Sequence, residues 1–152
     1  MKSVKIRDTI IGNGAKIAIQ SMLNVPTTDT GAAIDCILRL ADEGCDIIRL
    51  AVPDAAAARA MKEITAASPI PVVADIHFDY RLALACIDNG VDKIRINPGN
   101  LGGADKAAAV AKAANAAKVP IRIGINGGSL EKGLLERCGG DLALAMVESA
   151  QG

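Results

Sequence analysis

Aromatic residues are almost absent from this chain of 152 residues, which contains one tyrosine, one phenylalanine and no tryptophan. Hydrophobic residues nevertheless make up 51% of the sequence, so the core must be built from alanine, valine, leucine and isoleucine. Alanine-rich helices packed on β-branched strands meet that requirement. At this length we expect a single domain, residues 1–152, with a sizeable core.

The sequence also lacks net charge, because 17 lysines and arginines face 17 aspartates and glutamates. Proteins that bind nucleic acid or an anionic membrane through their overall field need an excess of positive charge. We therefore expect no nucleic-acid or membrane partner, and any anion binding must be local. No apolar run reaches membrane-spanning length and the first residues contain no signal-peptide core, which predicts a cytoplasmic protein.

Closely spaced cysteines are missing as well. The four cysteines form no Cys-x-x-Cys pair and no Cys/His ligand spacing, and they stand at positions Cys36, Cys45, Cys86 and Cys138. Such cysteines are expected to be reduced, buried and to pack as small hydrophobes. The sequence therefore predicts no metal site and no cofactor bound by this chain.

What the sequence does contain is a regular alternation of short β-branched runs with segments of helical period. Strands are predicted at residues 17–20, 47–51, 72–77, 93–97 and 121–125, and helices include 80–89, 104–117 and 142–150. Thr30, Asp54 and Asp79 are interpreted as helix caps. The residues from Val4 onwards predict a terminal hairpin with its turn at Asn13-Gly14.

Strand and helix alternate five times with short connections, which predicts a parallel sheet with right-handed crossovers. The motif Gly-x-Asp-x-Ile-Arg begins at Gly44 and recurs at Gly90, in the second and fourth strands. Similarity between alternate strands favours a β/α barrel, whose interior layers take side chains from every other strand. The predicted fold class is α/β, a partial TIM-type (β/α) barrel of about five parallel strand–helix units preceded by an N-terminal β-hairpin.

Polar side chains gather within these strands or at their C-terminal ends, where α/β proteins hold their sites. The candidates for ligand binding are Arg49, Arg95, Asn97, Arg122 and Asn126, and the candidates for proton transfer are Asp75 and His77. Burying guanidinium groups without partners is costly, and the strands offer a single carboxylate. The imbalance predicts an external anion, and the planar fork of arginine suits phosphate oxygens.

Simpler interpretations stay open for individual residues. Any one of the three arginines could pair with a carboxylate inside the protein, although this is less expected of all three. His77 could orient a loop by hydrogen bonding, or it could move a proton, with Asp75 setting its tautomer or binding a substrate hydroxyl.

Five stretches of the chain resemble the family of 4-hydroxy-3-methylbut-2-enyl diphosphate synthases, and the resemblance runs in order from about residue 3 to the end. The stretches are Gln20-Ser21-Met22, Arg49-x-Ala51-Val52-Pro53-Asp54, Ala74-Asp75-Ile76-His77-Phe78-Asp79-Tyr80-Arg81, Lys93-Ile94-Arg95-Ile96-Asn97-Pro98-Gly99-Asn100 and Ile121-Arg122-Ile123-Gly124-Ile125-Asn126-x-Gly128-Ser129-Leu130-Glu131-Lys132.

The resemblance implies an iron–sulfur oxidoreductase of isoprenoid biosynthesis by the methylerythritol phosphate route. It would open the ring of 2-C-methyl-D-erythritol 2,4-cyclodiphosphate with two electrons from flavodoxin or ferredoxin, and the enzyme would be a homo-oligomer. By the same resemblance the diphosphate-binding residues fall on Arg49, Arg95, Arg122, Asn97 and Asn126, and a catalytic Asp and His on Asp75 and His77.

Two parts of such an enzyme are not found among these residues. The resemblance implies three more strand–helix units and a C-terminal domain whose Cys-x-x-Cys helps to bind a 4Fe–4S cluster. We therefore expect this chain to be the substrate-binding part of the barrel and to be inactive alone.

Two other functions are consistent with the same residues. One is a different phosphate-handling barrel enzyme, such as a synthase of the pteroate type, which would bind a pterin. The other is a half-barrel that associates with itself and binds anions without catalysis, since a half-built barrel leaves sheet edges unpaired.

Overall fold

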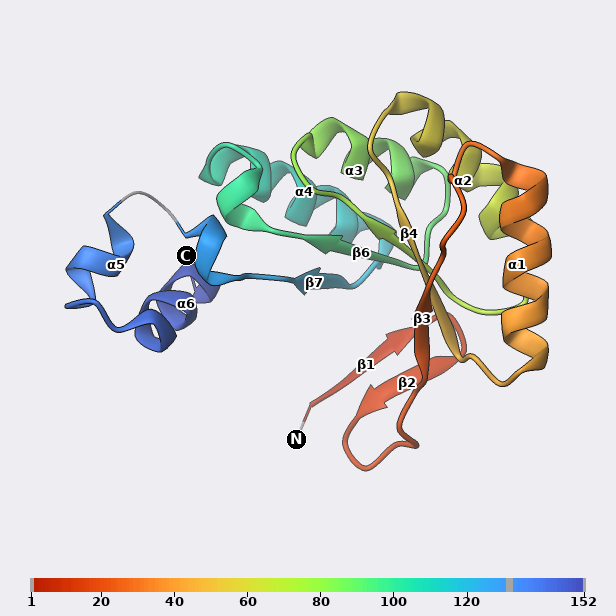
Figure 1. Cartoon of the computed structure of the whole chain (residues 1–152), viewed down its shortest axis with the longest axis horizontal. Helices are drawn as coiled ribbons and strands as arrows, with labels where there is room; N and C mark the ends of the chain where they lie inside the picture. The colour runs from red at the N-terminus through yellow and green to blue at the C-terminus, as the bar shows by residue number, and fades with distance from the viewer. Residues whose placement is uncertain (1, 131–132, 152) are drawn as a thin grey trace.

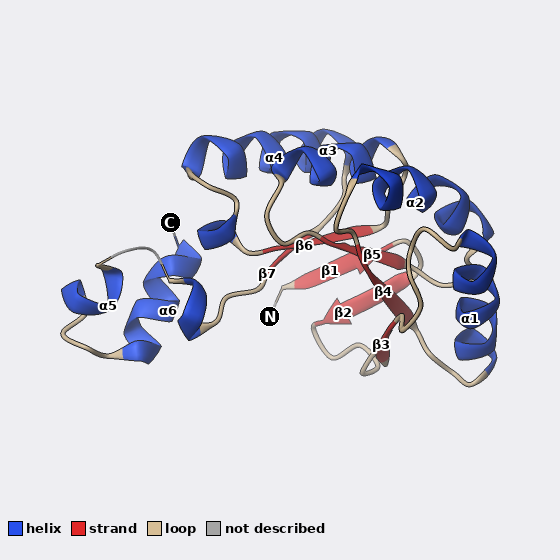
Figure 2. Ribbon diagram, turned by 45° about the horizontal axis from the view of Figure 1, so that its top comes forward, coloured by secondary structure: helices blue, strands red, loops and turns tan. Residues whose placement is uncertain are grey.

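The computed structural model describes residues 2–130 and 133–151, so Glu131 and Lys132 of the last family stretch lie outside the described residues. Five parallel strands form one sheet in the order β3-β4-β5-β6-β7 (Figures 1 and 2). Their bounds are β3 Gln20–Met22, β4 Ile47–Ala51, β5 Val72–Asp75, β6 Lys93–Ile96 and β7 Ile121–Ile123. Each strand neighbours the next one in sequence, as in a barrel wall, and the predicted fold class is confirmed.

Helices cover one face of this curved sheet (Figure 2). They are α1 Thr30–Asp42, α2 Ala55–Ala67, α3 Tyr80–Asp88 and α4 Ala104–Ala117. Every second strand residue points to them, so Ile48, Leu50 and Ile94 are fully buried in the core between sheet and helices. The intervening residues, Arg49 and Arg95 among them, are therefore on the opposite, inner face.

The C-terminal residues form a small separate cluster. Short helical turns η1 Pro98–Asn100 and η2 Gly127–Ser129 follow β6 and β7, and the chain then forms α5 Leu134–Arg137 and α6 Leu142–Gln151. Leu134, Cys138 and Ala145 pack together as a satellite core, and α6 lies at the left of Figure 1, away from α1 and α2. The main core therefore does not depend on these two helices. No helix in the described part of the chain is long and apolar enough to cross a membrane.

The terminal hairpin is present, but its predicted turn is wrong. Strands β1 Ser3–Ile6 and β2 Thr9–Gly12 pair antiparallel with Ile6 opposite Thr9, so the turn is Arg7-Asp8. Asn13 and Gly14 both have positive φ and form a tight turn after β2, but this turn joins no two strands. The side chain of Ile6 is buried against Ile47 and Val73, which places the hairpin against the inner face of the sheet.

Four strands and one cap also differ from the predictions. The first parallel strand is Gln20–Met22, since Gln20 pairs with the first residue of β4, and β5, β6 and β7 end at Asp75, Ile96 and Ile123. Thr30 does not cap α1, because the side chain of Asp29 accepts the backbone N–H of Ala32 and Thr30 is already helical. Asp54 and Asp79 cap α2 and α3 as predicted.

The recurring Gly-x-Asp motif has a structural explanation at both of its positions. Gly44 and Gly90 adopt φ of +90° and +83° just after α1 and α3, a conformation that glycine reaches at no steric cost. Asp46 then accepts the N–H of Ile19, and Asp92 accepts the N–H of Val72, each at 2.8 Å. Each aspartate thereby ties the start of its own strand to the start of the preceding one.

Asp92 also fixes the hairpin to the barrel. The guanidinium of Arg7 donates to both carboxylate oxygens of Asp92, Nε to Oδ1 at 3.0 Å and Nη2 to Oδ2 at 2.8 Å, and Nη1 donates to the carbonyl of Ser68 at 2.8 Å. Arg7 itself has φ of +49°, an unfavourable region for a residue with a side chain. The ion pair therefore holds the hairpin turn in a strained conformation against the N-terminal end of the sheet.

Replacing Arg7 with alanine should test this anchor. Because Arg7→Ala leaves a largely buried Asp92 without its guanidinium, we expect the free energy of unfolding to fall by about 1.5 to 3 kcal/mol. Urea unfolding followed by far-ultraviolet circular dichroism is the suitable measurement, since the chain has no tryptophan. The control is Lys16→Ala, which removes an ion pair to Asp46 whose lysine is 80% exposed and should cost about 0.5 kcal/mol. Equal losses in the two variants would contradict the anchoring role of Arg7.

Candidate anion site

A fully buried carboxylate lies at the centre of the inner face. Asp75 ends β5 and has no exposed surface. Its Oδ2 accepts Nε of Arg49 at 3.0 Å and also Nη2 of Arg49, and its Oδ1 accepts Nη1 of Arg95 at 3.2 Å. One carboxylate thus binds two guanidinium groups, which come from the strands on either side of β5.

The strand register explains why these side chains meet. Asp75 pairs with Arg95 and Arg95 pairs with Arg122, so the three form one row across β5, β6 and β7. Arg49 lies two residues lower, opposite Val73, and its long side chain reaches up to Asp75. The alternation of side chains along a strand predicts that these residues lie on one face of the sheet. The structure adds that Arg49 and Arg95 share the carboxylate of Asp75.

Arg95 is held from both sides. While Nη1 binds Asp75, Nη2 donates to the backbone carbonyl of Gly124 at 3.2 Å. The side chain is 13% exposed, and these two bonds use two of the five N–H groups of a guanidinium. The remaining N–H groups have no acceptor in the described part of the chain, so they can bind a ligand.

Arg122 joins the row without joining the ion pairs. Its residue is exposed, and it makes no hydrogen bond or ion pair within the described residues. Its charge acts on Lys93, whose pKa is lowered mainly by burial and secondly by Arg122. Lys93 lies on the same face as Arg95, two residues earlier, and the sequence analysis missed it although the period of two pointed to it.

His77 stands beside this cluster at the end of β5. Its Nε2 lies 3.7 Å from Oδ2 of Asp75, and 44% of its side chain is exposed. That distance is longer than a hydrogen bond, and Oδ2 already accepts two bonds from Arg49. His77 is therefore close enough to act on the same ligand as the arginines, but Asp75 does not fix its tautomer in this arrangement.

The two candidate amides lie in different environments. Asn97 follows β6, is 1% exposed and precedes η1. Asn126 follows β7 and is exposed, and its Oδ1 accepts the N–H of Gly128 at 3.1 Å. Asn97 continues the face of Arg95 at the strand end, whereas Asn126 shapes the glycine-rich turn.

The structure thus brings Arg49, Asp75 and Arg95 into direct contact, with His77 next to them. Arg122 is the neighbour of Arg95 in the row, and the amides follow at the strand ends. Three guanidinium groups lie on this face with one carboxylate, which binds two of them, and Lys93 adds another cation. The alternative of an internal partner holds for Arg49 and Arg95, but the cluster keeps an excess of positive charge.

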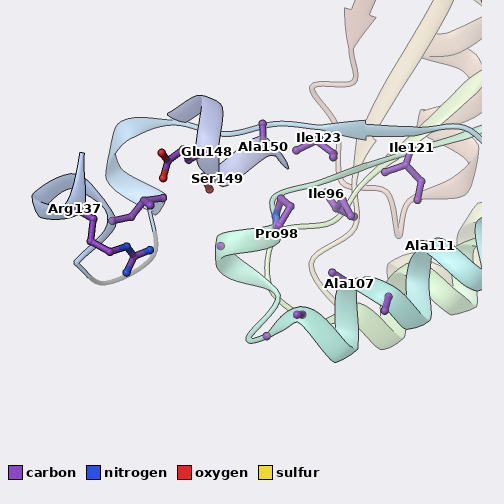
Figure 3. A pocket seen from close by; sticks show the side chains of 15 residues that line it. Ile96, Pro98, Ala107, Ala111, Ile121, Ile123, Arg137, Glu148, Ser149 and Ala150 are labelled. Carbon is purple, nitrogen blue, oxygen red and sulfur yellow. The ribbon is translucent and has the colours of Figure 1, made fainter. Parts of the chain in front are cut away.

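A separate apolar groove of about 800 Å³ lies elsewhere, between α4, the end of β7 and α6 (Figure 3). Alanines of α4, among them Ala107 and Ala111, face Ile121 and Ile123 across it. Arg137 and Glu148 also line the groove, whereas Arg49, Asp75 and Arg95 do not. The groove and the arginine cluster are therefore separate features of the molecule.

The residues described do not fit an iron–sulfur cluster. All four cysteines are free and three of them are buried, and residues 2–130 and 133–151 contain no group of three or more His, Cys, Asp or Glu placed to hold a metal ion. Burial raises the pKa of the Cys86 thiol to about 12, whereas metal ligation needs the thiolate. No step can be assigned to a cluster in this chain.

Comparison with solved structures shows the fold. The chain superposes on dihydropteroate synthase from Stenotrophomonas maltophilia with a TM-score of 0.62 and 17% identity, covering 99% of this chain and 61% of that one. Dihydropteroate synthase from Xanthomonas albilineans gives 0.61 and 14% identity, covering 98% and 61%. At such identities the similarity concerns the barrel architecture alone.

The chain is also similar in amino-acid sequence to curated proteins. Relatives named 4-hydroxy-3-methylbut-2-en-1-yl diphosphate synthase (flavodoxin) are 53% identical in Ruminiclostridium cellulolyticum, 55% in Maridesulfovibrio salexigens and 51% in Geobacter sulfurreducens. The alignments cover 98%, 95% and 99% of this chain, but 42%, 40% and 43% of those proteins. The chain thus spans about two fifths of the length of these relatives, and the predicted resemblance is confirmed. Because the family model of the GcpE TIM-barrel domain matches residues 1–152 in full, the chain belongs to the GcpE TIM-barrel family.

Proposed function

We propose that this chain is the substrate-binding barrel portion of a flavodoxin-dependent 4-hydroxy-3-methylbut-2-enyl diphosphate synthase. Its ligand would be 2-C-methyl-D-erythritol 2,4-cyclodiphosphate, and the reaction would be the reductive opening of that ring in isoprenoid biosynthesis. The observation that carries the proposal is the excess of guanidinium groups over carboxylates around Asp75. The names of relatives at about half identity support the choice of substrate.

The arginines would supply binding and orientation. Arginine presents N–H groups in a plane that matches two phosphate oxygens at once, so Arg95 and Arg122, adjacent in the row, suit a diphosphate. Arg49 adds a third donor from the other side of Asp75. Asn97 and Asn126 at the strand ends would add amide groups to the binding of the diphosphate.

Asp75 and His77 would have different tasks. The oxygens of Asp75 are occupied by Arg49 and Arg95. The negative charge of Asp75 would offset the repulsion between the two guanidinium groups before the ligand binds. His77, exposed at the mouth, would donate a proton to an oxygen of the ligand as charge develops there. Water leaves the substrate in this reaction, so a proton donor at that position is needed.

The redox step would come from outside the residues described. A 4Fe–4S cluster would supply two electrons passed on from flavodoxin, or from ferredoxin, and this chain would hold and orient the ring that accepts them. We propose a homo-oligomer for the complete enzyme, in which a cluster-bearing part meets this barrel.

Calorimetry with the cyclodiphosphate should test the binding role. Arg95→Ala removes a charged donor, and we expect binding to weaken by about 1 to 3 kcal/mol while the fold persists. The control is Arg59→Ala, which removes the same charge from the exposed face of α2 and should leave affinity unchanged. Binding of a pterin instead of the cyclodiphosphate, or equal affinity in both variants and the wild type, would reject the proposal.

The variant Asp75→Asn should test whether the negative charge of Asp75 stabilises the two arginines beside it. It leaves two guanidinium groups together without a carboxylate, so we expect the free energy of unfolding to fall by about 3 to 5 kcal/mol. Added diphosphate should then raise the unfolding midpoint more in this variant than in the wild type, because the anion replaces the missing charge. Circular dichroism measures both effects. The control Asp54→Asn keeps a good helix cap and should change neither quantity. An unaltered midpoint and response in Asp75→Asn would contradict this role.

A further inference from the structure

Gly124, the first residue after β7, leaves room that another residue would fill. A Cβ built on Gly124 would lie within 2.8 Å of Nε, Nη2 and Cζ of Arg95. Real Cβ atoms do not approach other heavy atoms so closely. A side chain at position 124 and the observed position of Arg95 therefore exclude each other.

The backbone gives no other reason for glycine at this position. Gly124 is not among the residues with positive φ, in contrast to Gly44 and Gly90. Its N–H extends the sheet by donating to the carbonyl of Ile96 at 2.8 Å, a geometry open to any residue except proline. The requirement for glycine thus comes from the guanidinium that lies over it.

From these contacts we infer that Gly124 is a positioning residue for Arg95, an inference that rests on the proposed binding of a diphosphate. Without a side chain at position 124, the guanidinium lies against Gly124, between Asp75 and the Gly124 carbonyl. Both bonds fix the plane of the guanidinium, and the plane fixes where its remaining N–H groups point. An alanine would displace the guanidinium and separate it from at least one of these acceptors.

The displaced group is the end of a flexible side chain, so the fold should tolerate the change. We expect Gly124→Ala to fold and to bind inorganic diphosphate about tenfold more weakly, comparable with the loss in Arg95→Ala. The double variant Gly124→Ala/Arg95→Ala should bind no more weakly than Arg95→Ala alone, because Gly124 acts through the guanidinium. A residue with a general structural role would weaken diphosphate binding equally with and without Arg95.

The matched control is Gly31→Ala, whose Cβ would have only Asp29 Oδ1 nearby, at 3.9 Å, and which should not change binding.

Urea unfolding of the wild type, Gly124→Ala, Arg95→Ala and the double variant gives a readout that needs no ligand. Gly124→Ala should lower the folding equilibrium constant by about fivefold when Arg95 is present, and leave it unchanged in the Arg95→Ala background. Wild-type affinity in Gly124→Ala, together with weakened Arg95→Ala, would overturn this inference and leave the proposed function standing. A further loss of binding in the double variant would overturn it too. If the wild type binds neither inorganic diphosphate nor the cyclodiphosphate, the proposed function fails, and the unfolding data alone decide whether Gly124 positions Arg95.

Discussion

The shared carboxylate of Asp75 is the interaction on which the inner face of this sheet depends. It lies on the middle strand, fully buried, and binds one arginine from each neighbouring strand. Without it, Arg49 and Arg95 would repel one another in a region that water reaches poorly, a situation costly in free energy. With it, both side chains have a fixed direction before any ligand arrives, and little ordering is left to oppose binding.

The same arrangement follows from one recurring sequence motif. At each of its positions, Gly-x-Asp-x-Ile-Arg ends a helix with a glycine, ties two strands at their start with an aspartate and places an arginine three residues later. Because the two copies occupy β4 and β6, Arg49 and Arg95 approach β5 from opposite sides. The repetition in the sequence is thus the reason that one carboxylate can serve two guanidinium groups.

Much of this could be predicted from the sequence, where local pattern decides the outcome. The bounds of β4 and α4 follow from β-branched runs and alanine-rich helical spacing, and the period of two puts Arg95 on the inner face. The turn at Arg7-Asp8 could not be predicted, because Arg7 is held at positive φ by Asp92, 85 residues away. Asn13-Gly14 carries the stronger local turn signal, but tertiary contacts select the other position.

For a related reason, the sequence could not predict that Arg49 and Arg95 both bind Asp75. In the register Arg49 stands opposite Val73, so its contact with Asp75 depends on strand stagger and on the length of the arginine side chain. Residue types and faces can be derived from spacing, whereas the choice among acceptors within reach needs coordinates. Gly124 illustrates the difference, because only the structure shows that the guanidinium of Arg95 lies against it.

Finally, the outer edge of β7 restricts what can pair with it. One edge of β7 pairs with β6, and within the residues described no strand pairs with its other edge. Any further strand that adds there in parallel will place a side chain next to Arg122, because the row across the sheet continues. An acidic residue at that point would neutralise Arg122. On the proposed function, a strand that pairs there should therefore carry a neutral or basic residue beside Arg122.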